Sequence, residues 1–198
     1  MGAPLPPVTG VVLAGGDSRR MGRDKVRLLL DTVHERLAPH CTAMIVVTRP
    51  ERCDEVRDFA PAGCEVIGDV VAGRGPLVGI HAALTASTTE RIFVAAVDMP
   101  WLSPALISAM IATAAGDVSI PRTAHGWEPA HALYHRRCLP IIERQLTAGP
   151  APVASFFASV EVDVWGEDRW RAFDPDGRSF GNLNTPGDLA AWMSEESG

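Results

Sequence analysis

Short runs of consecutive apolar residues, separated by stretches with helical spacing, constrain the fold of this chain more than any other feature. Three runs, at residues 10–14, 44–47 and 92–97, contain no alternating polar residues. Strands that are covered on both faces of a parallel sheet have this pattern. The helical stretches expected around these runs cover residues 28–37, 51–59 and 76–87. This alternation of strands and helices predicts the α/β class with a mostly parallel sheet.

The second half of the chain has a different pattern. Ser103 and Thr185 each precede a proline, and a hydroxyl N-cap followed by proline at the first helical position marks a helix start. After Gly116, apolar residues alternate with polar ones, and we expect a helix at 138–147 and a strand at 160–165. The pattern therefore predicts an added antiparallel or mixed portion of the sheet.

Composition excludes several classes of protein. The 198 residues fit one domain, for which we expect the bounds 8–193. The 18 basic and 24 acidic side chains give a net charge of −6, so we expect no nucleic acid partner. No apolar run approaches the roughly 20 residues of a bilayer-spanning helix, and the first residues lack a signal-peptide pattern. The sequence thus favours a cytoplasmic protein with no membrane partner.

A glycine-rich and basic segment, residues 13–25, follows the first predicted strand. Ligands of open α/β sheets bind beyond the carboxyl ends of the strands. Gly15 and Gly16 let backbone N–H groups approach an anion, and four nearby cations indicate a phosphate ligand. These cations are Arg19, Arg20, Arg23 and Lys25. A solvated turn with a charged surface is the alternative interpretation.

The same segment argues against two common nucleotide-binding classes. It contains no GxGxxG pattern, and no Gly-Lys-Ser or Gly-Lys-Thr follows Gly22. A dinucleotide-dependent dehydrogenase and a P-loop GTPase are therefore disfavoured. The sequence also shows no recognisable Ser-His-Asp or Cys-His arrangement for nucleophilic catalysis.

The segment at residues 13–25 resembles the LAGGxSxRMGxDK signature of the molybdenum cofactor guanylyltransferases, and every fixed position matches. Four further segments are similar to motifs of this family: residues 75–80, 97–102, 128–134 and 182–189. The resemblance extends over residues 10–192. It implies a Rossmann-like, mostly parallel sheet with helices on both faces and a small antiparallel extension, similar to the nucleotide-diphospho-sugar transferases.

The resemblance implies that the chain transfers GMP from GTP to the terminal phosphate of molybdopterin and releases pyrophosphate. The substrate phosphate is then itself the nucleophile, so the protein must position groups and neutralise charge. By the same resemblance, the catalytic residues are Arg20, Lys25 and Asp98. The nucleotide-binding residues it implies are Leu13, Ala14, Gly15, Gly16, Lys25, Asp69 and Asp98. Those implied for molybdopterin are His131, Asn182 and Asn184. A molybdopterin carrier or a molybdoenzyme chaperone is the expected kind of protein partner.

Asp98 follows the apolar run at residues 92–97. Burial of a carboxylate costs free energy unless a cation or hydrogen-bond donors compensate. Proteins commonly hold Mg²⁺ through one or two carboxylates together with substrate phosphates. We therefore expect Asp98 to bind Mg²⁺, with the capping of a turn as the alternative role.

Two positions depart from the family pattern. After Lys25, residues 26–28 run directly into the predicted helix, where the family has roughly eight to ten further residues in a loop of the kind that closes over a substrate. The loop is either lost or missing from this sequence, and we favour the second because such loops are often disordered without a ligand. Residues 48–50, Thr-Arg-Pro, stand where some relatives have an asparagine near the base. We therefore expect guanine recognition to depend on backbone groups.

Three other functions stay open. Cytidylyl transfer to the same cofactor is one, but its enzymes tend to have LAAG where this chain has LAGG at residues 13–16. Sugar-phosphate nucleotidyltransferases are usually longer and lack the Asn-x-Asn-Thr-Pro motif. A non-catalytic nucleotide or cofactor carrier is the third, and Lys25 and Asp98 argue against it. An assay for pyrophosphate release separates a carrier from an enzyme.

Overall fold

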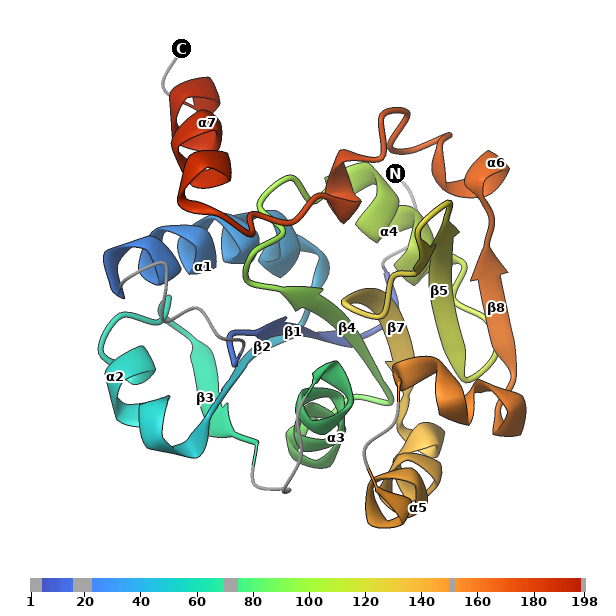
Figure 1. Ribbon diagram of the computed structural model, residues 1–198. Helices are drawn as coiled ribbons and strands as arrows, with labels where there is room; N and C mark the ends of the chain where they lie inside the picture. Colours follow the sequence, from blue (N-terminus) through green and yellow to red (C-terminus); the bar gives the residue numbers. More distant parts are fainter. Residues whose placement is uncertain (1–4, 16–22, 70–74, 150–151, 197–198) are drawn as a thin grey trace.

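A twisted sheet flanked by helices organises the protein (Figure 1). The computed structural model describes residues 5–15, 23–69, 75–149 and 152–196. These residues form a sheet in the order β3-β2-β1-β4-β7-β5-β6, with β8 paired to β5. The strands are β1 (Val8–Leu13), β2 (Ala43–Thr48), β3 (Cys64–Gly68), β4 (Arg91–Ala96), β5 (Val118–Thr123), β6 (Gly126–Trp127), β7 (His131–His135) and β8 (Val162–Trp165).

The first four strands are parallel. β1 pairs with β2 on one side and β4 on the other, and β3 pairs with β2. The three apolar runs lie in β1, β2 and β4, so the predicted α/β class is confirmed. The sequence did not predict β3, which lies at the sheet edge and buries only Val66, whereas Glu65 is exposed. An edge strand needs no continuous apolar run, and this one therefore lacks the signal that marks the others.

The remaining strands form the predicted extension. β7 is antiparallel to both β4 and β5, β6 is antiparallel to β5, and β8 runs parallel to β5. Because β7 reverses direction between them, β4 and β5 run the same way. The carboxyl ends of β1, β2, β3, β4 and β5 consequently meet at one edge of the sheet.

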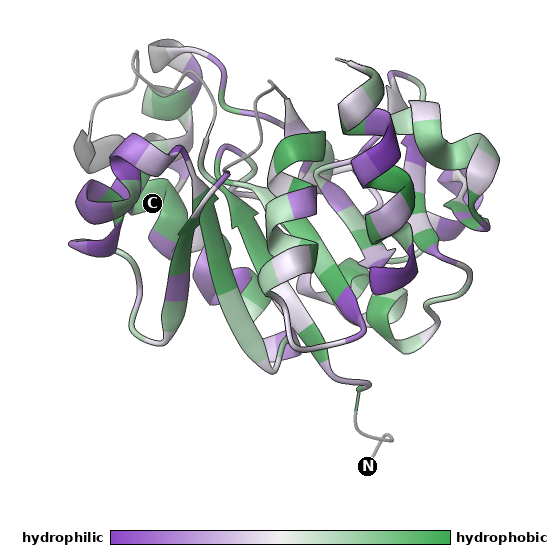
Figure 2. Ribbon diagram, turned by 90° about the horizontal axis from the view of Figure 1, so that it is seen from below, coloured by the Kyte–Doolittle hydropathy of each residue, from purple (hydrophilic) through white to green (hydrophobic). Residues whose placement is uncertain are grey.

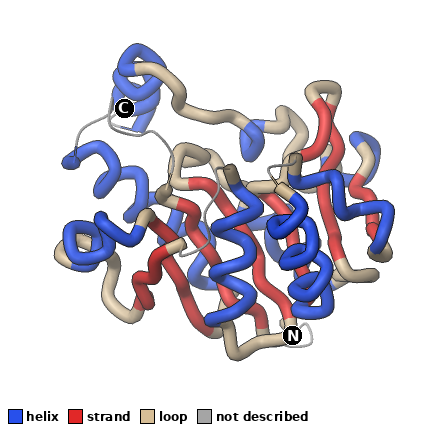
Figure 3. Tube along the Cα trace, turned by 60° about the horizontal axis from the view of Figure 1, so that its bottom comes forward, coloured by secondary structure: helices blue, strands red, loops and turns tan. Residues whose placement is uncertain are grey.

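Helices cover both faces of this sheet, as the tube in Figure 3 shows. In Figure 2 the strands are largely hydrophobic in colour, whereas the helices carry both polar and apolar residues, as helices between a core and water do. The α-helices are α1 (Arg23–Leu37), α2 (Cys53–Arg57), α3 (Pro76–Ala86), α4 (Pro104–Ala112), α5 (Leu139–Ala148), α6 (Glu167–Trp170) and α7 (Pro186–Glu196). Across the described part of the chain, no helix combines the length and apolar character that a membrane crossing requires.

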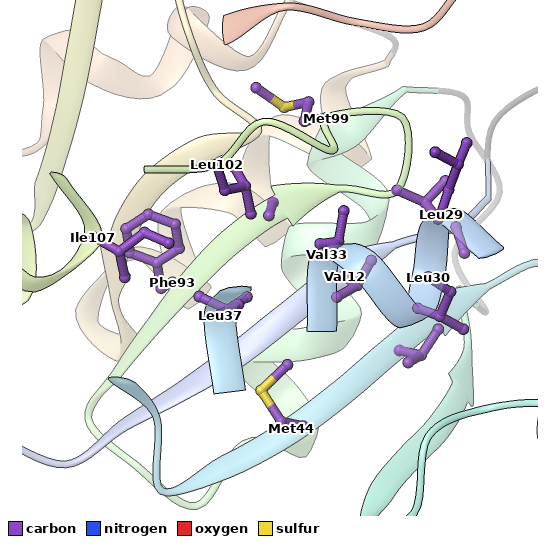
Figure 4. Close-up of a cluster of buried hydrophobic side chains, with 14 of the residues drawn as sticks. Val12, Leu29, Leu30, Val33, Leu37, Met44, Phe93, Met99, Leu102 and Ile107 are labelled. Atoms are coloured by element: carbon purple, nitrogen blue, oxygen red, sulfur yellow. The ribbon is translucent and has the colours of Figure 1, made fainter. Parts of the chain in front are cut away.

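Each face of the sheet has its own hydrophobic core. On one face, α1 and α4 pack with alternate strand residues such as Val12 and Phe93 (Figure 4). On the other face, α3 and α5 pack against the intervening residues, among them Val11 and Val94. Neighbouring residues of a strand thus enter different cores, which explains why residues on both faces of the strand are apolar.

Helix α1 runs without interruption through Val26 and Arg27, and Val26 is fully buried in the core. The prediction of a further segment after Lys25 is therefore wrong: the 198-residue sequence is continuous here, and the chain lacks the loop. A buried stripe at helical spacing begins directly after Lys25, so the helix needs no intervening residues to reach the core. This stripe consists of Val26, Leu29, Leu30, Val33 and Leu37.

Both predicted N-caps are confirmed. The Leu106 N–H donates to Ser103 Oγ at 3.3 Å at the start of α4. At the start of α7, the Asp188 N–H donates to Thr185 Oγ1 at 3.1 Å, and the Thr185 N–H donates to Asp188 Oδ2 at 2.8 Å. These bonds hold the pKa of Asp188 below its usual value. The reciprocal pair fixes the chain just before α7, where Asn182 and Asn184 lie.

Gly79 lets α3 lie close to the carboxyl end of β1. A Cβ atom at Gly79 would stand 2.8 Å from Leu13 Cδ2, closer than side chains tolerate. Leu13 opens the glycine-rich segment. Gly79, the second glycine of the motif at residues 75–80, thus allows α3 to pack closely beneath that segment.

Replacing Gly116 by Ala is expected to destabilise the extension by about 3 kcal/mol. Gly116 has φ of +62°, and its Cβ would lie 2.7 Å from the backbone oxygen of Glu161, where β5 and β8 begin to pair. Gly63→Ala is the matched control, since its φ is +84° but open space surrounds its Cβ position. We expect that control to cost about 1 kcal/mol in urea unfolding. Equal losses for the two variants would contradict the contact with Glu161.

Candidate active site

The described residues that follow the parallel strands gather at the common carboxyl edge. Ala14 and Gly15 follow β1, Arg49 follows β2, Asp69 follows β3, and Asp98 comes two residues after β4. The neighbouring strands β1 and β4 can be followed in Figure 1. The predicted nucleotide-binding positions that the structure describes are thus brought to one side of the sheet. Ligand sites of open α/β sheets lie at this edge.

Two backbone groups at the end of β1 and just after it belong to the sheet. The Leu13 carbonyl accepts a bond from the Val97 N–H at 3.1 Å, and the Ala14 N–H donates to the Val47 carbonyl at 2.8 Å. The Ala14 carbonyl and the Gly15 N–H have no hydrogen bond to another described residue. These two groups are the ones that a ligand can use without breaking the ladder.

Arg49 holds the Gly15 carbonyl, a contact that the sequence did not predict. Its Nε donates to the Gly15 oxygen at 3.1 Å. The Asp69 carboxylate also lies near Gly15, since a Cβ at Gly15 would be 3.7 Å from Asp69 Oδ2. Burial raises the pKa of Asp69, while its backbone hydrogen bond and the charge of Arg49 act in the opposite direction. Arg49 thus adds a guanidinium where the sequence suggested only backbone recognition.

Asp98 is half-buried in the turn after β4. Burial raises the pKa of its carboxyl group, and no other described side chain bonds to it. Within the described ranges, no group of three His, Cys, Asp or Glu side chains is arranged to hold a metal. A half-buried carboxylate without a cation fits the kind of magnesium site that one or two carboxylates complete with substrate phosphates.

A backbone hydrogen bond holds the segment with the two asparagines beside Asp98. The Leu183 N–H donates to the Asp98 carbonyl at 2.8 Å, which ties the segment before α7 to the turn after β4. Asn182 and Asn184 flank Leu183 and are both exposed, whereas Leu183 is buried. Their side chains are therefore accessible near the predicted metal ligand.

His131, in contrast, is fully buried at the start of β7. Its ring lies edge-on to Phe93 at 5.2 Å and to Phe180 at 5.3 Å between ring centres. Neither ring nitrogen has a hydrogen bond to the residues that the structure describes. Because no part of the ring is exposed, the structure does not bring His131 to the surface where Asn182 and Asn184 lie.

The burial of His131 predicts a loss of stability in mild acid. Burial lowers its pKa from 6.5 to about 4, and the charge of Asp174 only partly opposes this. The unfolded chain therefore binds more protons between these pH values, so stability falls as the pH falls through this window. From pH 7 to pH 5 we expect His131 to account for a loss of about 2 kcal/mol. Urea unfolding of His131→Phe should show a correspondingly smaller loss, and identical losses would mean that the folded protein protonates His131.

The structure gives no side-chain contacts for three predicted site residues. Gly16 and Arg20 lie outside the described residues. Lys25 lies in the first turn of α1, where the structure describes the backbone alone. Their roles stay predictions from the family pattern.

The fold and this sheet edge are those of a nucleotide-binding α/β transferase. Residues 10–162 match the model of the MobA-like NTP transferase domain. The chain is 36% identical over 191 residues to the molybdenum cofactor guanylyltransferase of Desulfosudis oleivorans, covering 92% of each chain. The chain belongs to the MobA-like NTP transferase family and is a nucleotidyltransferase enzyme. The resemblance seen in the sequence is therefore confirmed.

Solved structures agree with this assignment. The molybdopterin-guanine dinucleotide biosynthesis protein A of Archaeoglobus fulgidus matches with a TM-score of 0.79 and 29% identity, over 96% of this chain and 99% of that one. A Mycobacterium tuberculosis protein, crystallised in complex with manganese, matches with a TM-score of 0.55 and 20% identity, over 82% of this chain and 88% of that one. The second likeness concerns the fold alone.

Proposed function

We propose that this enzyme transfers GMP from GTP to the terminal phosphate of molybdopterin. The names of the relatives support the guanylyl donor and the acceptor. The observation that carries the proposal is Asp98: a half-buried carboxylate that pairs with no described cationic side chain, at the edge where the glycine-rich segment begins. Holding such a charge costs free energy, and a phosphate-transferring enzyme needs it for a metal ion.

The proposed reaction needs no nucleophile from the protein. An oxygen of the acceptor phosphate attacks the α-phosphorus of GTP, a new P–O bond forms, and the bond to the bridging oxygen of the β-phosphate breaks. Pyrophosphate leaves with that oxygen and its electrons. The protein must hold the two substrates in line and neutralise the charge that builds up.

The chain's own residues supply these effects. Asp98 would hold Mg²⁺ with the phosphates, and Asp69 would lie near the nucleotide. When bound, Mg²⁺ supplies positive charge to the reacting phosphate oxygens. Lys25 and Arg20 would add further positive charge at the triphosphate.

For the base, we propose recognition by the free Ala14 carbonyl and Gly15 N–H. Guanine presents a donor and an acceptor on its Watson–Crick edge, which suit these groups. Arg49 would keep the Gly15 peptide in place through its bond to the carbonyl. An unpaired polar group left by the wrong base penalises ATP and CTP.

The acceptor side of the proposal rests on Asn182 and Asn184, which are exposed beside Asp98. His131 would act only through packing, because it is buried. We propose that residues 8–193 form one nucleotidyltransferase domain. We also propose a cytoplasmic location, where GTP is available, with a molybdopterin carrier or molybdoenzyme chaperone as protein partner.

The test is a comparison of the four nucleoside triphosphates. Purified protein is incubated with molybdopterin, Mg²⁺ and each triphosphate in turn, and pyrophosphate release is followed. We expect release with GTP and little with CTP, ATP or UTP. Release with CTP alone would replace the guanylyl assignment by cytidylyl transfer.

A further inference from the structure

Glu128 lies at the same sheet edge as Asp98, and the site described above does not use it. It follows β6 in the connection between β5 and β7. His131, three residues later, pairs with Ala95 of β4, which is three residues before Asp98. The connection that carries Glu128 therefore leaves the sheet beside the turn that carries Asp98.

The carboxylate of Glu128 is held by one hydrogen bond. Thr123 Oγ1 donates to Glu128 Oε1 at 2.8 Å, and the His125 N–H donates to the same hydroxyl oxygen at 3.1 Å. Oε2 has no hydrogen bond among the described residues. The local structure thus orients the carboxylate and leaves one oxygen available.

Within the described part of the chain, no Lys, Arg or His side chain forms an ion pair with this carboxylate. The nearby Arg122 places its guanidinium 5.0 Å from the centre of the Trp127 ring instead of forming an ion pair with Glu128. Glu128 is half-buried, and burial raises the pKa of its carboxyl group even though Thr123 and His125 act in the opposite direction. An oriented carboxylate without an ion-pair partner is a strong acceptor for a ligand with N–H groups.

The order of the strands indicates which substrate Glu128 would contact. The proposed nucleotide groups follow β1, β2 and β3, which lie on one side of β4, whereas Glu128 lies between β5 and β7 on the other side. Asp98 follows β4, between the two groups. Because the proposed nucleotide groups take up the β1 side of Asp98, the β7 side is the one left for the acceptor.

We propose that Glu128 binds the amino-bearing edge of the acceptor's pterin ring. This inference rests on the proposed function, which makes molybdopterin the acceptor. The 2-amino group and the adjacent ring N–H of a pterin are donors, and the free oxygen of Glu128 accepts from them. Thr123 is a positioning residue for this carboxylate.

Steady-state kinetics of Glu128→Gln test the proposal, because the amide keeps the shape but loses the charge. The KM for molybdopterin should rise about tenfold or more, while the KM for GTP stays within about twofold. Glu65→Gln is the matched control: Glu65 is exposed in β3, and this change should alter neither constant. An unchanged KM for molybdopterin, or a rise in the KM for GTP instead, would overturn the proposal.

A binding measurement separates this proposal from the reaction itself. Fluorescence titration of the full chain compares pterin with lumazine, in which an oxygen replaces the 2-amino group. Wild type should bind pterin about tenfold more tightly, and Glu128→Gln should lose most of that preference. If the variant keeps it, or wild type shows none, the assignment of Glu128 is wrong. If the preference depends on Glu128 but GTP yields no pyrophosphate, the proposed transfer fails and the pterin site stands.

Discussion

Asp98→Asn is expected to lower pyrophosphate release by about 10³-fold. The amide keeps the size of the side chain but loses the charge that would hold Mg²⁺. The melting temperature should stay the same or rise, because burial raises the pKa of Asp98 and the folded protein therefore holds its charge at a cost. Activity is measured at saturating Mg²⁺ beside a thermal melting curve.

The matched control is Asp176→Asn. Asp176 is exposed in the turn before Gly177, so the same chemical change should leave activity near that of wild type. Turnover of Asp98→Asn within about threefold of wild type would remove Asp98 from the metal site. A large fall in the melting temperature would mean that Asp98 supports the fold instead.

Gly15→Ala should reduce kcat/KM for GTP by about 10²-fold without a loss of stability. A Cβ at this position would meet ordinary contacts only, the nearest atom being Asp69 Oδ2 at 3.7 Å. The fold therefore has room for the methyl group. A loss of kcat/KM for GTP would then arise because the methyl group keeps the nucleotide base from approaching the backbone. Kinetics with GTP and a melting curve together separate these effects.

Gly187→Ala is the comparison for this change. Its Cβ would also meet only an ordinary contact, with Thr185 Oγ1 at 3.6 Å, and it lies in α7, outside the segment after β1. We expect GTP use by this variant to match wild type. Unchanged GTP use by Gly15→Ala would contradict base recognition at Gly15.

Features that depend on local sequence could be predicted. The β-branched runs of β1, β2 and β4 are buried on both faces, and such strands leave a continuous apolar pattern. The caps at Ser103 and Thr185 involve residues three positions away, so their signals lie within one turn of sequence. The place of Asp98 at the carboxyl edge of the sheet was predictable because it comes two residues after a buried strand.

Features that depend on distant contacts could not be predicted. The bond from Arg49 to the Gly15 carbonyl joins residues 34 positions apart, and the sequence near either residue contains no pattern that predicts it. The burial of His131 depends on packing against Phe93 and Phe180, and the alternating pattern of β7 does not show which face is covered more deeply. The family motif at residues 128–134 includes Glu128, but only the structure shows that no described cationic side chain pairs with its carboxylate.

The most direct test of the central claim follows the two ends of the triphosphate. GTP radiolabelled on its α-phosphate, and separately on its γ-phosphate, is incubated with the enzyme, molybdopterin and Mg²⁺. GMP transfer predicts that the α-label appears in a dinucleotide product and the γ-label in pyrophosphate. Appearance of the γ-label in the molybdopterin product, or of neither label outside GTP, would contradict GMP transfer by this enzyme.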